Sequence, residues 1–349
     1  MKNLKIKHIV SIVMIASIFI GLFSSCSNDD NSNSIGPLEV TSVSKAEAGD
    51  LVPTTLGYPA NMYVIQGSGF LGVKKIYFND VDTYFNPTLV TDTAIFVTID
   101  LNTPYANASN ELKIETANGS VVYPFVIAPP APILKSYNPI NAADGDVVTI
   151  YGSFFLNPTV KFGTTAATVI SSTLEQIKVT VPAGSNGKYP TVTTISGSSS
   201  STDAVGSAIY DDIFHGIDGI GGWGVSNTNI ENVIPEEVAQ GEKAIKVDIT
   251  SWSGFQIDMW ANGGHPVPAN AIGIKFQMKL KAAARMRVIV GGDWGHEVWF
   301  NIAADYDTYV VKWSDLGMTA APAAIGQLVF GSDGTATTFY IDNLGFALK

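Results

Sequence analysis

Residues 145–155 read Gly-Asp-Val-Val-Thr-Ile-Tyr-Gly-Ser-Phe-Phe, and this stretch decides the fold of the chain. Apolar side chains alternate from Val147 to Tyr151, which is the period of a β-strand with one buried face. The strand ends in a glycine-rich bend, and residues 159–163, Thr-Val-Lys-Phe-Gly, give the next strand. The pattern predicts a β-sandwich around this segment.

An earlier segment repeats the pattern. Residues 61–70, Asn-Met-Tyr-Val-Ile-Gln-Gly-Ser-Gly-Phe, again form an alternating strand that ends in a glycine bend, and 73–79 give the following strand. The first copy carries a long insertion around Pro53–Pro59, whereas the second also contains the late strand Ile177-Lys-Val-Thr-Val-Pro182. We therefore expect two sandwiches, at residues 36–128 and 131–205.

The Gly-x-x-Phe bend of both copies resembles immunoglobulin-like IPT/TIG domains. Neither copy contains a tryptophan. The interpretation that follows is that both are spacers; the alternative is that one of them is itself the binding module.

Two segments mark the expected joints between domains. Pro129-Pro-Ala-Pro132 favours stiff, extended polyproline geometry. Ser196-Gly-Ser-Ser-Ser-Ser-Thr202 predicts a loop or soft link. Composition changes after it, because all six tryptophans follow: Trp223, Trp252, Trp260, Trp294, Trp299 and Trp313.

Residues 206–349 again predict strands separated by turns, so the chain as a whole is expected to be all-β. The opening Ile209-Tyr-Asp-Asp-Ile213 and the closing Tyr340-Ile-Asp-Asn-Leu-Gly-Phe346 resemble the first and last strands of jelly-roll carbohydrate-binding modules. The resemblance implies a third β-sandwich that binds glycan.

The N-terminus predicts export. Lys2, Lys5 and Lys7 precede an apolar run, Ile9–Phe23, which has signal-peptide length and is short for a membrane span. The single cysteine, Cys26, follows two serines and resembles the lipidated residue of a bacterial lipobox; the alternative is an ordinary secretory signal. We expect a signal peptide at 1–25 and a lipidated flexible tether at 26–35, with no later membrane span.

The charge balance excludes some partners. The formal net charge is −11, and only 15% of residues are charged. An acidic surface disfavours nucleic acid, which requires basic patches. It equally disfavours bulk electrostatic capture of an anionic polysaccharide.

Taken together, the lipoprotein start, the tandem IPT/TIG-like repeats and the C-terminal module resemble surface glycan-binding lipoproteins of starch-utilisation-like uptake systems of Bacteroidetes. The resemblance implies a location on the outer face of the outer membrane. It also implies a neighbouring porin-type glycan transporter and hydrolases as partners.

Strand alternation selects candidate binding residues. From Gly254 to Trp260 one set of side chains is apolar, and the other set contains Asp258 and Trp260. The same argument places Trp299, Glu297 and Arg287 on an outward face. Tryptophan rings stack on sugars and charged groups bind hydroxyls. The candidate glycan contacts are therefore Trp252, Trp260, Trp294, Trp299, Asp258, Arg287 and Glu297.

The remaining tryptophans have other expected roles. Trp252 and Trp294 lie in turn-rich segments, where contacts at the rim of a site usually originate. Trp313 is in register with Tyr309 and Val311 and is expected in the core. Trp223, in a predicted glycine-rich loop, is expected to be a packing residue.

Metal and catalytic chemistry is weakly indicated. Gly219-Ile-Gly-Gly-Trp-Gly224 matches G-x-G-x-x-G, but no helix follows it, so a dinucleotide site is not predicted. No cofactor is required. The resemblance implies a structural calcium between the first and last strands of the module, and the alternative is that its carboxylates are solvated. The implied ligands are Asp211 or Asp212, Glu242 and Asp342.

The sequence thus favours a non-catalytic protein that binds a neutral polysaccharide. A β-glucan such as xyloglucan, mixed-linkage glucan or β-1,3-glucan is the expected ligand. The second hypothesis is an adhesion or assembly protein whose C-terminal domain docks a protein partner. The third hypothesis is a glycoside hydrolase, which needs two carboxylates that flank the scissile glycosidic bond. Asp293 and Glu297 are close in sequence and are the candidates for such a pair.

Overall fold

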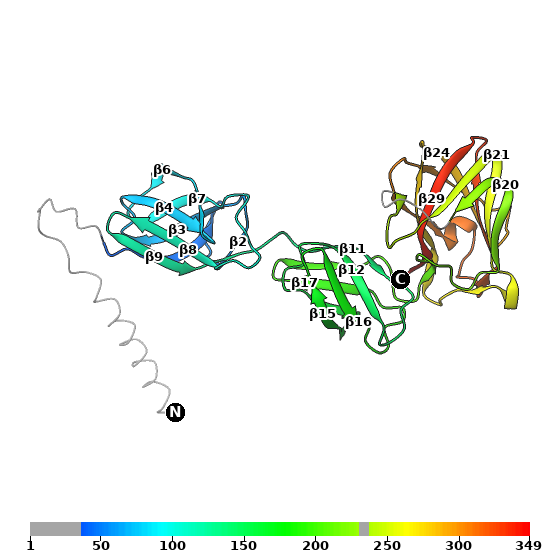
Figure 1. Cartoon of the computed structure of the whole chain (residues 1–349), viewed down its shortest axis with the longest axis horizontal. Helices are drawn as coiled ribbons and strands as arrows, with labels where there is room; N and C mark the ends of the chain where they lie inside the picture. The colour runs from blue at the N-terminus through cyan, green and yellow to red at the C-terminus, as the bar shows by residue number, and fades with distance from the viewer. Residues whose placement is uncertain (1–35, 230–236) are drawn as a thin grey trace, which may run out of the picture.

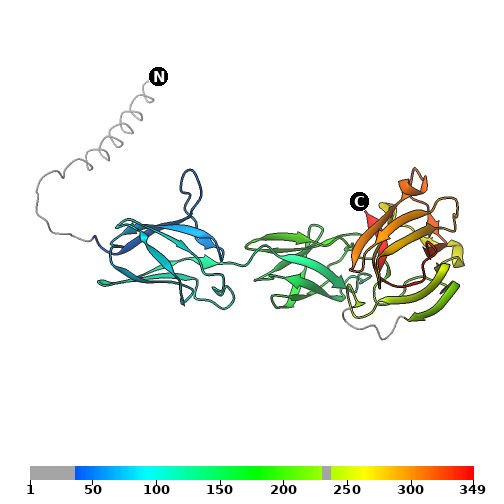
Figure 2. The ribbon, with the colours of Figure 1, turned by 90° about the horizontal axis from the view of Figure 1, so that it is seen from above.

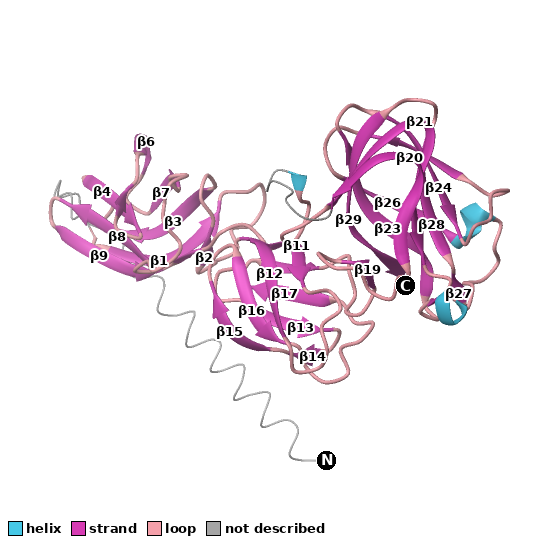
Figure 3. Ribbon diagram, turned by 45° about the vertical axis from the view of Figure 1, so that its right-hand side comes forward, coloured by secondary structure: helices cyan, strands magenta, loops and turns pink. Residues whose placement is uncertain are grey.

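The computed structural model describes residues 36–229 and 237–349, and Figure 1 shows three β-sandwiches that follow one another along its long axis. The predicted signal peptide, Cys26 and the tether lie outside the described residues. Strands and loops make up almost all of the described chain, with 3₁₀ turns as the helical elements (Figure 3). Among the residues described, no helix is long and apolar enough to cross a membrane.

The first sandwich packs two four-stranded sheets face to face, with strand orders β1-β3-β7-β6 and β5-β4-β8-β9. The small parallel pair β2–β10 lies beside them and contains part of the predicted insertion. The bounds are β1 (Glu39–Lys45), β2 (Leu56–Gly57), β3 (Met62–Ser68), β4 (Val73–Phe78), β5 (Val81–Asp82), β6 (Phe85–Val90), β7 (Ala94–Thr98), β8 (Glu111–Thr116), β9 (Gly119–Pro124) and β10 (Val126–Ile127).

The second sandwich repeats this topology strand for strand, with orders β11-β12-β16-β15 and β14-β13-β17-β18. The serine-rich segment expected to be a soft link is instead the edge strand β18. Its serine hydroxyls pair across the ladder with threonines of β17, at 2.7 and 2.8 Å. The bounds are β11 (Ile133–Asn138), β12 (Val147–Ser153), β13 (Thr159–Phe162), β14 (Thr165–Ala166), β15 (Thr168–Ser172), β16 (Gln176–Thr180), β17 (Pro190–Thr194) and β18 (Gly197–Ser200).

The repeated Gly-x-x-Phe bend has the same packing role in both sandwiches. A Cβ added at Gly67 would lie 2.7 Å from the Phe70 ring, and one at Gly152 would collide with the Phe155 ring. Both phenylalanines are fully buried. Each glycine therefore leaves space for the aromatic ring that closes its core.

The C-terminal sandwich is one nine-stranded sheet folded into two layers, and β21 passes from one layer to the other at a bend. Residues 245–249 of β21 pair with β29, whereas residues 254–258 pair with β28. Figures 1 and 2 show the resulting layers at the C-terminal end of the molecule. The bounds are β19 (Ala208–Tyr210), β20 (Gly219–Asn229), β21 (Ile245–Asp258), η3 (Ala261–Gly263), β22 (His265–Pro266), β23 (Ala271–Leu280), β24 (Ala284–Val290), β25 (Val298–Ile302), β26 (Asp307–Lys312), η4 (Trp313–Leu316), β27 (Ala324–Ile325), β28 (Gln327–Ser332) and β29 (Thr337–Leu348).

The core of this sandwich confirms the alternation read from the sequence. Rings from opposite layers meet there, with the centroids of Phe276 and Phe330 5.1 Å apart. Trp313 is 4% exposed, as predicted, and its indole N–H donates to the Ala271 carbonyl at 2.8 Å. The apolar residues that alternation places inward in 254–260 and 286–290 are all buried: Phe255, Ile257, Met259, Met286, Val288 and Val290.

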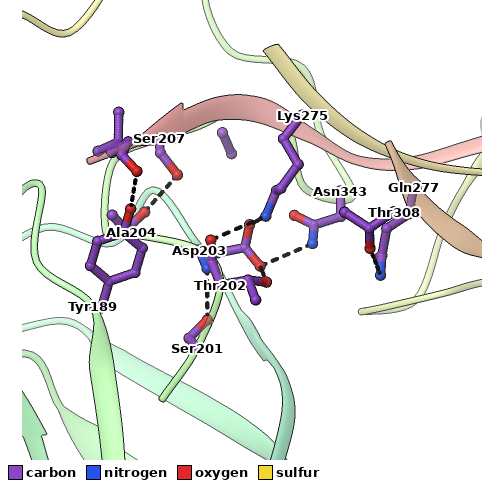
Figure 4. Close-up of polar contacts among 12 residues, drawn as sticks. Tyr189, Ser201, Thr202, Asp203, Ala204, Ser207, Lys275, Gln277, Thr308 and Asn343 are labelled. Atoms are coloured by element: carbon purple, nitrogen blue, oxygen red, sulfur yellow. Dashed lines mark hydrogen bonds and ion pairs between the residues drawn. The ribbon is translucent and has the colours of Figure 1, made fainter. Parts of the chain in front are cut away.

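A buried polar network joins the second and third sandwiches (Figure 4). Lys275 of β23 forms an ion pair with Asp203, and each side chain is 6% exposed. The Asn343 amide of β29 donates to the same Asp203 carboxylate at 3.0 Å. The Lys275 ammonium also reaches the carbonyl of Thr202 at 3.5 Å. Asp203 thus receives donors from two strands of the neighbouring sandwich.

Hydrogen bonds between side chains and backbone groups further connect the second and third sandwiches. The Asn141 side chain accepts from the Ala208 N–H at 2.9 Å and donates to the Ala208 carbonyl at 2.8 Å. The carboxylate of Asp211 accepts the N–H groups of Ile140 and Asn141 at 2.6 and 3.1 Å. The Tyr189 hydroxyl donates to the Leu348 carbonyl at 2.9 Å. These bonds fix the C-terminal sandwich against the second one.

Candidate functional site

The outer face of the layer formed by β20, β21, β28, β24 and β25 carries a continuous lateral row of residues. Trp223 lies opposite Gly254, Gly254 opposite Gly331, Gly331 opposite Arg287, and Arg287 opposite Trp299. In this row two glycines lie between Trp223 on one side and Arg287 and Trp299 on the other. The row brings together residues from five strands that are distant in sequence.

The glycines let large side chains lie against the sheet. A Cβ added at Gly254 would meet three atoms of the Trp223 six-membered ring, at 2.5, 2.7 and 2.9 Å. One added at Gly331 would approach Arg287 Nε to 2.7 Å. The Trp223 ring and the Arg287 side chain therefore rest on backbone that has no side chain of its own.

Trp294, from the loop after β24, adds a third tryptophan ring beside this row. The centroids of Trp294 and Trp223 are 5.4 Å apart at an interplanar angle of 50°. The Arg287 guanidinium lies 5.8 Å from the Trp294 ring centre. Trp294 is 49% exposed and Trp223 is 37% exposed, so both retain surface for a ligand.

Hydrogen bonds order the loop that presents Trp294. His296 Nδ1 lies 2.8 Å from Asp293 Oδ2, and the Gly295 N–H donates to Asp293 Oδ1 at 3.0 Å. These bonds lower the pKa of the Asp293 carboxyl, with the His296 contact as the main cause. Gly291 and Gly292 begin the loop with left-handed φ angles of 69° and 74°, which suit glycine.

At the β25 end of the row, Glu297 holds two neighbours. One of its oxygens accepts Arg287 Nη1 at 3.1 Å, and the other accepts the Trp299 indole N–H at 3.0 Å. The Arg285 guanidinium lies 4.5 Å above the Trp299 ring. Trp299 is on the outer face, as alternation predicts, but it is only part-exposed and already paired.

Trp260 lies at the other end of the same sheet face. It lies two residues beyond the end of β21, as the N-cap residue of η3, and its ring rests on Gly326, where an added Cβ would collide with it. The ring is 55% exposed. Nearby, Asp258 accepts the Gln327 amide at 2.8 Å. Trp260 and Asp258 are both outward, in agreement with the alternation.

Trp252 occupies the bend of β21. A loop was expected at this position, but β21 runs through it. The backbone of the strand bends at Trp252, which has a left-handed φ of 56°. Its ring atoms would lie 2.9, 3.0 and 3.0 Å from a Cβ added at Gly334, so the ring covers that glycine. The side chain is 63% exposed, and its carbonyl accepts the Trp223 indole N–H at 2.9 Å.

Trp223 is the residue that the sequence argument missed. The glycine-rich segment around it was expected to be a loop with a buried ring, whereas it forms β20 and presents Trp223 outward. The feature that could have revealed the outward position of Trp223 is its cross-strand partner, Gly254. A tryptophan that points outward opposite a glycine has room to lie flat on the sheet. Which residues are opposite each other is known only once the strand register is known.

Among the described residues, no group of three or more His, Cys, Asp or Glu side chains is arranged to hold a metal ion. The calcium site that the resemblance implies stays a prediction, and the structure shows other partners for its carboxylates. Asp211 caps backbone N–H groups at the joint, and Asp212 accepts the N–H groups of Glu242 and Lys243 at 2.9 and 2.8 Å. The Glu242 residue itself is exposed. The carboxylates therefore serve separate backbone segments.

Asp342 also has a structural role. It is fully buried, and it accepts the N–H groups of Ala239 and Gln240 at 2.9 and 3.0 Å. Burial raises its pKa to about 7, against the opposing effect of these donors.

Comparison with known proteins confirms the IPT/TIG resemblance. The IPT/TIG domain family matches residues 132–207. An IPT/TIG domain-containing protein of Bacteroides ovatus is 30% identical over 138 residues, which are 38% of this chain and 27% of that protein. The matched segment therefore spans about a quarter of that relative's length.

Solved structures similar to this chain include surface glycan-binding proteins. One is PbSGBP-B of Prevotella bryantii, with 17% identity, a TM-score of 0.49, and coverage of 89% of this chain and 98% of that one. Another is an SGBP-B from a complex xyloglucan utilization locus of Bacteroides uniformis, with 15% identity, a TM-score of 0.35, and coverage of 89% and 99%. Neither likeness specifies a ligand for this chain.

Proposed function

We propose that this protein binds a neutral polysaccharide on the outer face of its C-terminal sandwich. The observation that carries the proposal is that Trp223, Trp252 and Trp260 each rest on a glycine and stay exposed. An indole ring of this kind offers a flat apolar surface to the C–H side of a pyranose ring. Arg287, Glu297 and Asp258 supply hydrogen-bonding groups for sugar hydroxyls.

The same proposal includes a place in the cell. Cys26 would carry the lipid that anchors the chain to the outer membrane, facing the exterior. There the protein would hold a β-glucan, such as xyloglucan, mixed-linkage glucan or β-1,3-glucan, for a porin-type transporter and its hydrolases. The chain itself would not be an enzyme, so release of reducing sugar from any of these glucans would contradict the proposal.

Affinity gel electrophoresis tests the class of ligand. The chain from residue 36 onward should be retarded in a gel that contains one of these three neutral glucans. A nucleic acid or an anionic polysaccharide should not retard it at physiological salt, because the chain is acidic. Failure of every neutral glucan, together with capture of a protein partner on the same face, would favour the adhesion hypothesis instead.

Trp294→Ala should weaken binding of the retained glucan by about 1–3 kcal/mol, the range for an aromatic anchor. The ring is half-exposed, so the melting temperature should change little. Titration calorimetry beside a thermal melt measures both effects. Tyr84→Ala is the control, because Tyr84 is an 83% exposed aromatic on the first sandwich and should bind nothing here. Unchanged affinity in Trp294→Ala would remove this ring from the site.

A further inference from the structure

Three of the four exposed tryptophans of the C-terminal sandwich are arranged along β21, and the fourth, Trp294, packs beside Trp223. Trp252 marks the bend, Trp223 covers Gly254 two residues further on, and Trp260 lies just beyond the strand end. Their rings are 63%, 37% and 55% exposed, respectively. Three partly exposed tryptophan rings therefore lie on or next to the single strand β21.

Each of these rings has one side against a glycine, at Gly334, Gly254 and Gly326. A side chain on any of the three glycines would push its ring away from the sheet. The arrangement holds the rings low, so that a ligand can pass from one to the next. Polar groups occupy the interval, where Gln327 and Asp258 are hydrogen-bonded at 2.8 Å.

The distance along the strand sets the length of the ligand. From Gly254 to Asp258, the last residue of β21, an extended strand rises roughly 13 Å, which corresponds to about three pyranose residues in an extended chain; Trp260 lies two residues beyond that end, as the N-cap residue of η3. A mono- or disaccharide is too short to contact the Trp223–Trp252 end and Trp260 together. A longer linear chain can contact several of them together.

Resting on the function proposed above, we propose that the glycan lies along β21 and that the site selects extended linear chains long enough to reach Trp260 from the Trp223–Trp252 end. The affinity then comes from two separated aromatic contacts on the same chain. Gly326 and Gly254 act as positioning residues, since they set the height of the rings without touching the sugar.

The structure disfavours the other direction, across the strands toward Trp299. The Arg285 guanidinium lies over that ring, and Glu297 takes its indole N–H. A ligand that followed the lateral row would have to displace Arg285 or use the ring edge. Along β21, Trp252 and Trp260 are 63% and 55% exposed, and Trp223 is 37% exposed beside Trp294.

Titration of cello- and laminari-oligosaccharides from disaccharide to heptasaccharide tests the proposal, with the series chosen by the glucan that the gel retains. Affinity should rise by about tenfold or more between trisaccharide and hexasaccharide and then level off, as a second aromatic contact is gained. Trp260→Ala should remove most of this gain and leave trisaccharide binding unchanged. Trp260→Phe should keep part of it.

Gly326→Ala should act in the same direction as Trp260→Ala, because the added methyl group collides with the Trp260 ring. Gly219→Ala is its matched control in the same sandwich, since a methyl group there meets no atom within 4 Å. Thermal melts of all variants establish that they fold.

The outcomes separate this inference from the function it rests on. If no neutral glucan binds, the proposed function fails and the inference fails with it. If a glucan binds but the trisaccharide binds as tightly as the hexasaccharide, only the inference is overturned. It is equally overturned if Trp299→Ala removes the gain with length and Trp260→Ala does not, because the chain then runs across the strands.

Discussion

Asp203→Ala should destabilise the C-terminal pair of sandwiches by about 3–5 kcal/mol, the cost of removing one partner from a buried ion pair. Lys275 and Asp203 are each 6% exposed, so the ammonium left behind has no access to bulk water. Asn343 would lose its acceptor in the same variant. Differential scanning calorimetry of the chain from residue 36 measures the loss and shows which transition moves.

Two comparisons make this result specific. Glu115→Ala breaks the exposed Lys113–Glu115 pair and should cost about 0–1 kcal/mol. The double variant Asp203→Leu with Lys275→Met removes both charges, and it should recover much of the stability, because apolar replacements of buried pairs are often neutral. An Asp203→Ala protein that melts like the parent would mean that water reaches the joint.

The loss in Asp203→Ala should also depend on pH. Burial lowers the pKa of Lys275 to about 7 from its ordinary value of 10.5, and removal of the carboxylate takes away the charge that opposes this shift. A cation whose pKa is lower in the folded state destabilises the fold when it is protonated. Stability should therefore rise from about pH 7 toward 10.5 in the parent, and the loss in Asp203→Ala should be largest below about pH 7, where Lys275 is protonated without its counter-charge.

Trp313→Ala is expected to cost about 3–5 kcal/mol through the cavity it leaves in the core. The ring packs in the cluster that contains Phe276 and Phe330, and its N–H satisfies the Ala271 carbonyl. The same calorimetric scan should show a large fall in the melting temperature of the C-terminal sandwich. Glycan affinity of the folded fraction should stay at the parental value, since Trp313 lies inside the sandwich.

Trp252→Ala is the matched comparison, because it removes the same side chain from a 63% exposed position. It should leave the melting temperature nearly unchanged and weaken binding of long glycans. If Trp252→Ala proved the more destabilising of the two, the inward and outward assignments of these tryptophans would be reversed.

Alternation along single strands was enough to predict which residues of β24, and of β21 after its bend, face the core. Alternation is informative there because one face of the strand packs against the core, so apolar side chains mark that face. The Gly-x-x-Phe bend was equally informative, since glycine and ring are close in sequence. The repeated topology of the first two sandwiches follows from these local signals.

Features that depend on a partner strand or domain could not be predicted. Trp223 sits among glycines that disfavour a strand on propensity alone, and only its pairing with Gly254 explains its outward ring. Lys275 alternates with Ile274 and Phe276, so the sequence places it in solvent; the second sandwich covers it instead. The carboxylates implied as calcium ligands likewise bind backbone groups contributed by distant segments.

The central position of β29 bears on the order in which the chain folds. Strand β19 pairs with β29 across roughly 135 residues of intervening sequence, and such non-local pairing slows folding. The sheets of the second sandwich, by contrast, pair strands that all lie between residues 133 and 200. We expect that sandwich to fold first and to present Asp203 on a finished surface. The slow kinetic phase would then be the arrival of β29, which completes the C-terminal core and docks Asn343 in one step.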